Sequence, residues 1–289
     1  MKRSKLFWRS LLMSLAVIVP FYGMVALYGL SRAAPVQEIR TDVPITHPTS
    51  TDAKTLLVMT GDEQPENFVL IRFDALENRV ATMAVSGQLA VPGTAGRQSL
   101  TQAVEQAGPA QAAELLYQVV GVPVSDYVYC DGATLARLTA GLGNAGMSLA
   151  NYMSAATLGE LQLSIPGVGS MTLNTDLFAQ VLAAGAANPE RELLLRGEGY
   201  LAFLKAGMEH LTEVLPDAMR TAVSQCSTAL TATKIYDYER IFRFLEKQGP
   251  ECRAFTLPGE YDAEGLFSPG QQADAAVRSF LHGDEAAVD

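Results

Sequence analysis

Short apolar runs and stretches with helical spacing alternate along most of the chain. Residues 56–59 form a continuous apolar run that stops at Thr60-Gly61-Asp62, which is typical of a buried strand ending at a turn. Residues 67–74 and 79–86 have the same character, and the four residues between them suit a hairpin loop. We therefore predict three consecutive strands, with a further strand at 127–131.

Longer segments carry apolar residues at helical spacing. Leu135, Leu138 and Leu142 repeat in this way before Gly143, a residue type that commonly ends helices. The pattern also predicts a second hairpin from 161–165 and 170–174, and a strand near 254–257. Helices are predicted at 102–107, 110–120, 135–142, 175–186, 189–214, 216–225, 234–247 and 271–281.

Strands interleaved with helices predict a fold of the α/β class, a single α/β/α sandwich with a mixed central sheet. Strands covered on both faces read as near-continuous apolar runs, as these do. The side chains that we expect to be buried share these runs: Leu57, Met59, Val69, Ile71, Met83, Val85, Val120, Val128, Leu135 and Leu138.

The first 31 residues have the pattern of a membrane segment. Four basic residues within 1–9 precede an uncharged run of 22 residues from 10 to 31, long enough to cross a hydrocarbon core as a helix. The positive-inside rule places 1–9 in the cytoplasm and the rest outside, at the cell membrane. A cleaved signal peptide is the alternative, although its apolar core usually has about 7–15 residues. Both interpretations export the domain.

Composition divides the rest of the chain. Residues 32–53 are rich in Pro, Thr and Ala and lack periodicity, which predicts a stalk, while 54–283 form the domain and 284–289 an acidic tail.

From residue 33 onward 16 basic residues oppose 31 acidic ones, giving a net charge of −15. Such a field repels phosphate backbones, so no nucleic-acid partner is expected. With 48% apolar residues the chain is not intrinsically disordered.

The residues that usually bind metals or form disulfides are few. Three cysteines exclude a disulfide-dense scaffold. Cys226 and Cys252 could pair outside the cell, whereas the simpler interpretation is three small buried apolar residues. The three histidines lie far apart in the sequence, which argues against a histidine-rich metal site.

One glycine motif has the wrong context for its best-known function. Residues 141–146 match Gly-x-Gly-x-x-Gly. Dinucleotide binding requires a strand before these glycines and a helix after them, but the preceding residues have helical spacing. We interpret the motif as a glycine-rich helix stop.

The order of these elements resembles the LytR-CpsA-Psr family of bacterial envelope proteins. The most similar segment is 119–131 (VVGVPVSDYVYCD), which resembles the family pattern Leu-Leu-Gly-Ile-Pro-Ile-Asp-Tyr-Tyr-Val-x-Val-Asp. LLVMTGD at 56–62 resembles the family's first strand, and FVLIRFD at 68–74 and RVATMAV at 79–85 resemble the next two. The resemblance extends from about residue 54 to 281.

The resemblance implies a cytoplasmic tail, one membrane helix and an extracytoplasmic α/β/α domain. Active members transfer glycopolymers from polyprenyl-pyrophosphate carriers to peptidoglycan or, in some cases, to protein. In these enzymes arginines hold the pyrophosphate and aspartates bind magnesium, since guanidinium groups and divalent cations neutralise phosphate oxygens.

This sequence keeps only part of the family's catalytic pattern. Asp62 matches the first aspartate, Glu66 replaces the second, and Arg196 matches one arginine. These three are the candidate catalytic residues, with Asp62 and Glu66 as the candidate metal ligands. The other arginine positions fall on residues that carry no positive charge: Gln64, Ser86 to Gln88, an arginine-free stretch near 177–185, and Gly199. The candidate phosphate-binding residues are Arg72, Arg79 and Arg196.

The missing arginines favour a membrane-anchored envelope protein that has lost most or all transferase activity and acts as a binding or regulatory partner. Two alternatives stay open: an active polyprenyl-pyrophosphate glycopolymer transferase with a rewired site, and an extracytoplasmic ligand-binding module. The candidate partners are the membrane, a polyprenyl-linked glycan, peptidoglycan or another envelope protein. Magnesium is the cofactor to expect if the protein is active.

The topology can be tested directly. If 10–31 spans the membrane with the basic flank inside, protease added to intact spheroplasts should digest the domain and spare an epitope tag fused before Met1. Immunoblots against the domain and the tag measure both. A domain fully protected in intact spheroplasts would contradict the prediction.

Overall fold

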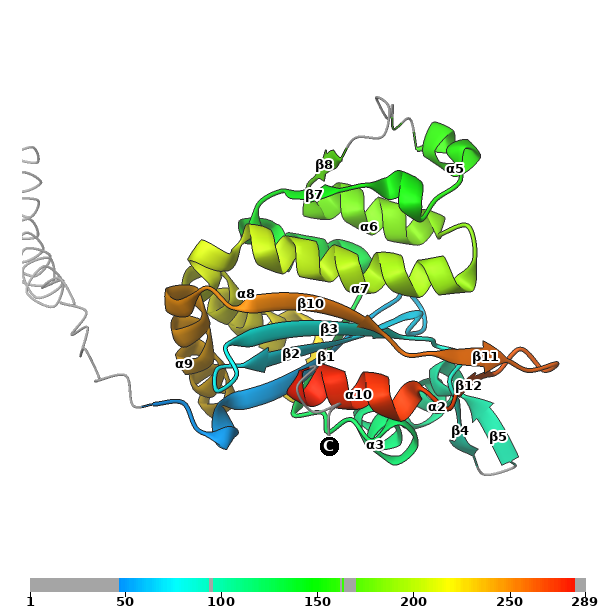
Figure 1. The fold of residues 1–289 in the computed structure, drawn as a ribbon, viewed down its shortest axis with the longest axis horizontal. Helices are drawn as coiled ribbons and strands as arrows, with labels where there is room; N and C mark the ends of the chain where they lie inside the picture. Colours follow the sequence, from blue (N-terminus) through cyan, green and yellow to red (C-terminus); the bar gives the residue numbers. More distant parts are fainter. Residues whose placement is uncertain (1–46, 94–95, 162, 164–169, 284–289) are drawn as a thin grey trace, which may run out of the picture. The chain divides into compact units, whose positions relative to one another are not determined.

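A six-stranded mixed sheet forms the centre of the described part of the chain in the computed structural model (Figure 1). The structure describes residues 47–93, 96–161, 163 and 170–283. The strands of this sheet are β1 (Ala53–Thr60), β2 (Asn67–Asp74), β3 (Arg79–Val85), β6 (Asp126–Cys130), β9 (Ser227–Thr228) and β10 (Glu251–Thr256). Their order is β10-β3-β2-β1-β6-β9.

The centre of the sheet is an antiparallel meander of β1, β2 and β3, as the sequence predicts. The loop at 75–78 joins β2 to β3, and Asn78 adopts the left-handed conformation (φ 48°) that Asn tolerates better than most residues. β6 then lies parallel to β1, and β10 lies parallel to β3. The result is the mixed sheet expected from the interleaved pattern.

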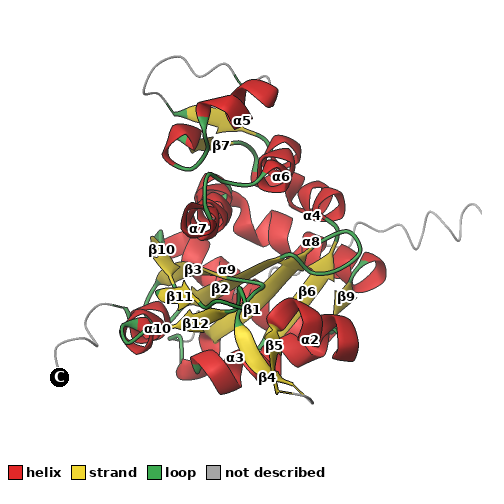
Figure 2. Cartoon of the chain, turned by 90° about the vertical axis from the view of Figure 1, so that its right-hand side faces the viewer, coloured by secondary structure: helices red, strands yellow, loops and turns green. Residues whose placement is uncertain are grey.

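Helices cover both faces of the sheet (Figure 2). Even-numbered residues of β1 and odd-numbered residues of β2 face one helical layer, and the alternate residues face the other. The first layer contains α4 (Gly132–Thr139), α6 (Thr175–Ala184), α7 (Pro189–Ala206), α8 (Leu211–Gln225) and α9 (Ala232–Gln248). The second contains α2 (Leu100–Ala107), α3 (Pro109–Val120) and α10 (Ala273–His282).

Short elements complete the described part of the chain. Two-stranded sheets form between β4 (Ala90–Gly93) and β5 (Gly96–Ser99), and between β11 (Gly259–Tyr261) and β12 (Phe267–Pro269). A third joins β7 (Ala145–Met147) and β8 (Met171–Leu173), near α5 (Ala155–Glu160).

The predicted tail at 1–9, the membrane segment at 10–31 and the acidic tail at 284–289 lie outside the described residues. Within the described part, no helix is both long and apolar enough to cross a membrane. The end of the predicted stalk is folded: residues 50–52 form a 3-10 helix, and the Asp52 carboxylate accepts a hydrogen bond from Arg240 of α9.

Two predicted elements differ from the structure. The helix expected at 189–214 ends at Ala206, since Gly207 leaves the helical conformation (φ −91°, ψ 10°) and a 3-10 turn at Met208–His210 leads into α8. Where the sequence predicts a hairpin from 161–165 and 170–174, β8 pairs with β7. Residues 162 and 164–169 of that predicted hairpin lie outside the described residues.

The glycine motif at 141–146 is a helix stop, as predicted. A 3-10 turn at 140–142 ends at Gly143, which has φ 84°, and β7 follows. A helical turn therefore precedes the glycines and a strand follows them, the reverse of the order that dinucleotide binding requires.

The two cysteines considered as a pair lie at opposite edges of the sheet. Cys252 belongs to β10, whereas Cys226 lies next to β9, with four strands between these two edge strands. Neighbouring strands are about 4.8 Å apart, so a Cys226–Cys252 disulfide is excluded on distance. Cys130, Cys226 and Cys252 are all free thiols.

Eight of the ten side chains that the sequence predicts to be buried are buried in the structure: Leu57, Met59, Val69, Ile71, Met83, Val85, Val120 and Val128. Leu135 and Leu138 are only half-buried. Both residues lie on α4 and line a cavity, so part of each side chain faces open space instead of neighbouring atoms.

Candidate functional site

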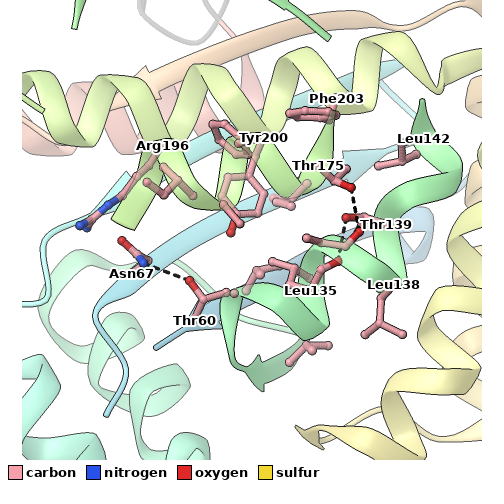
Figure 3. Close-up of a pocket in the computed structure, with 18 of the residues that line it drawn as sticks. Thr60, Asn67, Leu135, Leu138, Thr139, Leu142, Thr175, Arg196, Tyr200 and Phe203 are labelled. Atoms are coloured by element: carbon pink, nitrogen blue, oxygen red, sulfur yellow. Dashed lines mark hydrogen bonds between the residues drawn. The ribbon is translucent and has the colours of Figure 1, made fainter. Parts of the chain in front are cut away.

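A cavity of about 310 Å³ lies between one face of the sheet and α4, α6, α7 and α8. Its floor is made of apolar side chains from three central strands, namely Leu56, Val58, Ile71, Phe73 and Val128. Figure 3 shows Leu135, Leu138, Leu142 and Phe203 around the same space. The helical walls add further apolar side chains, including Ala136, Phe178, Ala179, Leu182, Leu215, Ala218, Met219 and Ala222.

The hydroxyl groups deep in the cavity are already hydrogen-bonded to the backbone. Thr175 Oγ1 donates to the Ala136 carbonyl (2.9 Å), and Thr139 Oγ1 donates to the Leu135 carbonyl (2.8 Å) (Figure 3). The hydrogen of each hydroxyl group is thus already bonded. The threonines can therefore present their methyl groups to the cavity at no cost in hydrogen bonds. The deep part of the cavity suits a hydrocarbon chain.

A tight loop after β1 carries two carboxylates to one end of the cavity, which we call the mouth. Asp62 and Glu66 both line the cavity and are exposed. The loop closes through a hydrogen bond from Glu66 N to Thr60 O (2.9 Å). Only glycine fits at position 61, since a Cβ there would lie 1.8 Å from Gln64 O.

Arg196 of α7 brings a guanidinium group to the mouth. Its side chain is 9% exposed and pairs with Glu192 one helical turn earlier. Nη1 also donates to the Glu66 carbonyl (3.4 Å). Burial lowers the pKa of Arg196, and the Glu192 carboxylate opposes that effect. Most of the positive charge is thus neutralised within the protein.

The mouth carries more negative than positive charge. Of the described residues that line the cavity, Arg196 alone is basic, while Asp62, Glu66 and Glu192 are acidic. No cluster of three or more His, Cys, Asp or Glu side chains that could hold a metal occurs in the described ranges. Asp62 and Glu66 remain a pair of carboxylates, and magnesium is commonly bound by one or two carboxylates together with substrate phosphates.

The structure brings together three of the five predicted site residues and separates the other two. Asp62, Glu66 and Arg196 all line the cavity, and Arg196 contacts the backbone of Glu66. Arg72 lies on the opposite face of β2, where it pairs with Asp74 (2.9 Å), because alternate strand residues point to opposite faces. The phosphate-binding role predicted for Arg72 is therefore not supported.

Arg79 is committed to a structural contact. It lies at the start of β3, where its guanidinium donates to the backbone carbonyls of Ser279 (3.1 Å) and Phe280 (3.0 Å) of α10 and pairs with Glu77. The side chain is buried under the layer on the far side of the sheet from the cavity. The phosphate-binding role predicted for Arg79 is not supported either.

The positions where the resemblance places further arginines are occupied by groups with other contacts. Ser86 Oγ hydrogen-bonds the Tyr261 hydroxyl (3.0 Å). At Gly199 an added Cβ would lie 2.2 Å from the ring of Phe178, which packs against Tyr200 and Phe203. The space that a larger residue at 199 would need is thus taken by an aromatic cluster of the cavity wall.

Sequence reasoning missed two contributors to the mouth. Glu192, which neutralises Arg196, was recognisable as its i−4 neighbour on a predicted helix. Tyr200 lines the cavity four residues after Arg196, and the same helical spacing points to it. The apolar wall left no signal, because a run of Ala, Leu and Val is the same whether it fills a core or lines a cavity.

The fold is shared with solved bacterial structures at low sequence identity. No protein-family model and no curated protein matches this sequence. A putative transcription regulator from Eubacterium siraeum superimposes with a TM-score of 0.70 at 16% identity, covering 86% of this chain and 99% of that one. YwtF from Bacillus subtilis gives a TM-score of 0.61 at 14% identity, with 82% and 94% covered.

A structure of YwtF, also called TagT, contains a bound octaprenyl pyrophosphate lipid and is described as a LytR-CPS2A-psr family protein. It matches with a TM-score of 0.58 and 15% identity over 81% of this chain and 90% of that one. The fold of this chain is therefore that of LytR-CpsA-Psr proteins, and the fold expected from the resemblance is confirmed.

Filling the space beside Gly199 should destabilise the protein. Gly199→Ala drives a methyl group into the packed ring of Phe178, and overpacking of this kind costs about 1–3 kcal/mol. Gly159→Ala on exposed helix α5 is the matched control, since its methyl group meets open space and should be neutral or stabilising. Thermal unfolding followed by circular dichroism measures both, and equal melting temperatures would contradict this account of position 199.

Proposed function

We propose that the chain is a LytR-CpsA-Psr family member, anchored in the membrane by residues 10–31, that binds a polyprenyl-type lipid and has lost glycopolymer transfer. Its domain then acts outside the cell membrane, in envelope assembly, as a binding or regulatory partner. The lipid-linked glycan, peptidoglycan or another envelope protein is the partner for that role.

The cavity is the observation that carries this proposal. Its floor and walls are apolar, and its deep hydroxyl groups are bonded to the backbone. Burying apolar surface releases about 25 cal/mol per Å², so a chain of isoprene units gains affinity from its length alone. TagT, which shares the fold, holds an octaprenyl chain with its pyrophosphate.

The loss of transfer rests on the charges at the mouth. Transfer from a pyrophosphate carrier depends on cations that hold the departing phosphates in place, and electrostatic positioning supplies most of the rate. Here one guanidinium faces the cavity, and Glu192 already neutralises it. Each missing charge-assisted contact removes about 1.5–3 kcal/mol.

One observation favours a second candidate function, a transferase with a rewired site. Three charged residues of the predicted site, Asp62, Glu66 and Arg196, line the same cavity. In that case the two carboxylates would hold magnesium, which would supply Lewis-acid chemistry to a pyrophosphate, and Arg196 would contact a phosphate oxygen. The Glu192 pair would then have to open to release the guanidinium.

Blocking the cavity should weaken lipid binding. Ala179→Trp places an indole in the lined space and should weaken octaprenol binding to the full-length protein in nanodiscs by at least about tenfold, since the chain loses buried area. Gln180→Trp, on the same helix but exposed and outside the cavity, is the matched control. Native mass spectrometry measures the bound fraction. Equal binding by the two variants would refute a lipid site here.

Transfer activity should be absent. With a polyprenyl-pyrophosphate-linked glycan and a peptidoglycan acceptor, the purified full-length protein should release no polyprenyl phosphate product with or without magnesium, because the phosphate clamp is missing. Radiolabelled lipid separated by chromatography provides the measurement. Magnesium-dependent turnover that disappears in Asp62→Ala or Arg196→Ala would establish the rewired enzyme instead.

A further inference from the structure

Two free thiols lie opposite each other on neighbouring strands of the central sheet. β6 and β9 are antiparallel neighbours, with Tyr129 opposite Ser227 (Figure 2). The next position of the same register sets Cys130, the last residue of β6, opposite Cys226. Cys226 has an extended backbone (φ −123°, ψ 160°), so the strand geometry continues through it.

The hydrogen bonding of this ladder places the two cysteines at a position of close approach. The Ala229 amide donates to the Tyr127 carbonyl (3.3 Å), which makes these opposed residues a hydrogen-bonded pair. The two kinds of pair alternate along an antiparallel ladder, so Cys130 and Cys226, three positions further on, form a non-hydrogen-bonded pair. The α-carbons of such a pair are about 4.5 Å apart. Because disulfides join α-carbons about 4.4–6.8 Å apart, neither strand has to move for the thiols to bond.

Both thiols belong to the same face of the sheet. Alternate residues of a strand share a face, so Cys130 lies on the side of Val128, which is part of the cavity floor. Both cysteines pack in the apolar cluster on that side, where Cys130 is buried and Cys226 is half-buried. Burial raises the pKa of the Cys130 thiol, and the adjacent Cys226 thiol raises it further. Cys226 is thus the member of the pair that a reagent from solvent meets first.

The two cysteines enclose the helical wall of the cavity. Cys130 lies two residues before α4, and Cys226 directly follows α8. The chain between them also contains α6 and α7, so all four helices of the cavity wall lie within the loop that a bond between these cysteines would close. Such a bond would hold both ends of the wall at the same place on the sheet.

We infer that Cys130 and Cys226 form a disulfide on oxidation and thereby fasten the helical wall of the cavity to the sheet, while Cys252 stays a free thiol. The bond would form whether or not the cavity holds a lipid, so it goes beyond the proposed lipid binding.

The oxidant is a second disulfide, carried by a protein or by a small thiol compound. The Cys226 thiolate attacks one of its sulfurs and releases the other as a thiolate, which leaves a mixed disulfide. The Cys130 thiolate then attacks Cys226 Sγ and releases the remaining thiol. The protein loses two electrons and two protons, and the oxidant gains them as it becomes two thiols.

Oxidation of the purified full-length protein tests the pairing. The protein is treated with oxidised glutathione, the remaining thiols are blocked with N-ethylmaleimide, and the peptides are mapped by mass spectrometry without reduction. We expect one pair of peptides joined through Cys130 and Cys226, with Cys252 carrying the blocking group. Three blocked thiols, glutathione adducts alone, or a disulfide that includes Cys252 would overturn the inference.

The fastening of the wall has separate measurements. Closing a long loop restricts the unfolded chain, so the oxidised protein should melt about 5–15 °C above the same protein treated with a phosphine reductant. Hydrogen exchange should slow about tenfold in α4 and α8, which adjoin the bond, and less in α10 of the other layer. Equal melting temperatures, or equal exchange in α4 and α8, would show that the bond does not fasten the wall.

Two single variants separate the pair from the third cysteine. Cys226→Ser should abolish both the joined peptides and the rise in melting temperature on oxidation. Cys252→Ser, on the far edge strand β10, is the matched control and should keep both. A rise that persists in Cys226→Ser would refute the assignment. Circular dichroism shows whether each variant is folded, and if one is not, the comparison of oxidised with reduced wild-type protein decides.

Discussion

The two-sided burial of β1, β2 and β3 is the constraint on which the rest of the structure depends. Successive side chains on these strands are apolar, so neither face can be left to solvent. Two helical layers follow from this, and every other element is positioned against the layered core. The same alternation sends Val69 and Ile71 towards the cavity side and directs Arg72 to the opposite layer, which removes it from the site.

The cavity arises because the helical layer above one face is built partly from small residues. Ala136, Ala179, Ala218 and Ala222 face the space between the helices and the sheet, where larger side chains would fill it. Leaving such a volume empty forfeits dispersion contacts along its lining, so an apolar chain that enters restores them. The cavity is therefore a feature that a hydrophobic ligand would stabilise.

The ion pair between Glu192 and Arg196 decides the chemistry at the mouth. A buried guanidinium without a partner would attract any phosphate within reach. Once it is paired, separating the two charges is strongly unfavourable, so the pair resists a phosphate. Because the partner is on the same helix, one turn away, the pair forms with local structure and needs no ligand. A site with this arrangement can bind lipid while offering little to a pyrophosphate.

The sequence by itself determined the strand meander, most helices, the buried runs and the family-like order of elements, because hydrophobic periodicity is a local property of the chain. It also indicated that Asp62, Glu66 and Arg196 were the charged groups to examine. Only the tertiary structure decided that Arg72 and Arg79 lie away from the mouth, that β8 pairs with β7, and that Leu135 and Leu138 line a cavity. These outcomes depend on which segments meet across long sequence separations, and an apolar residue has the same periodicity whether its neighbour is another side chain or open space.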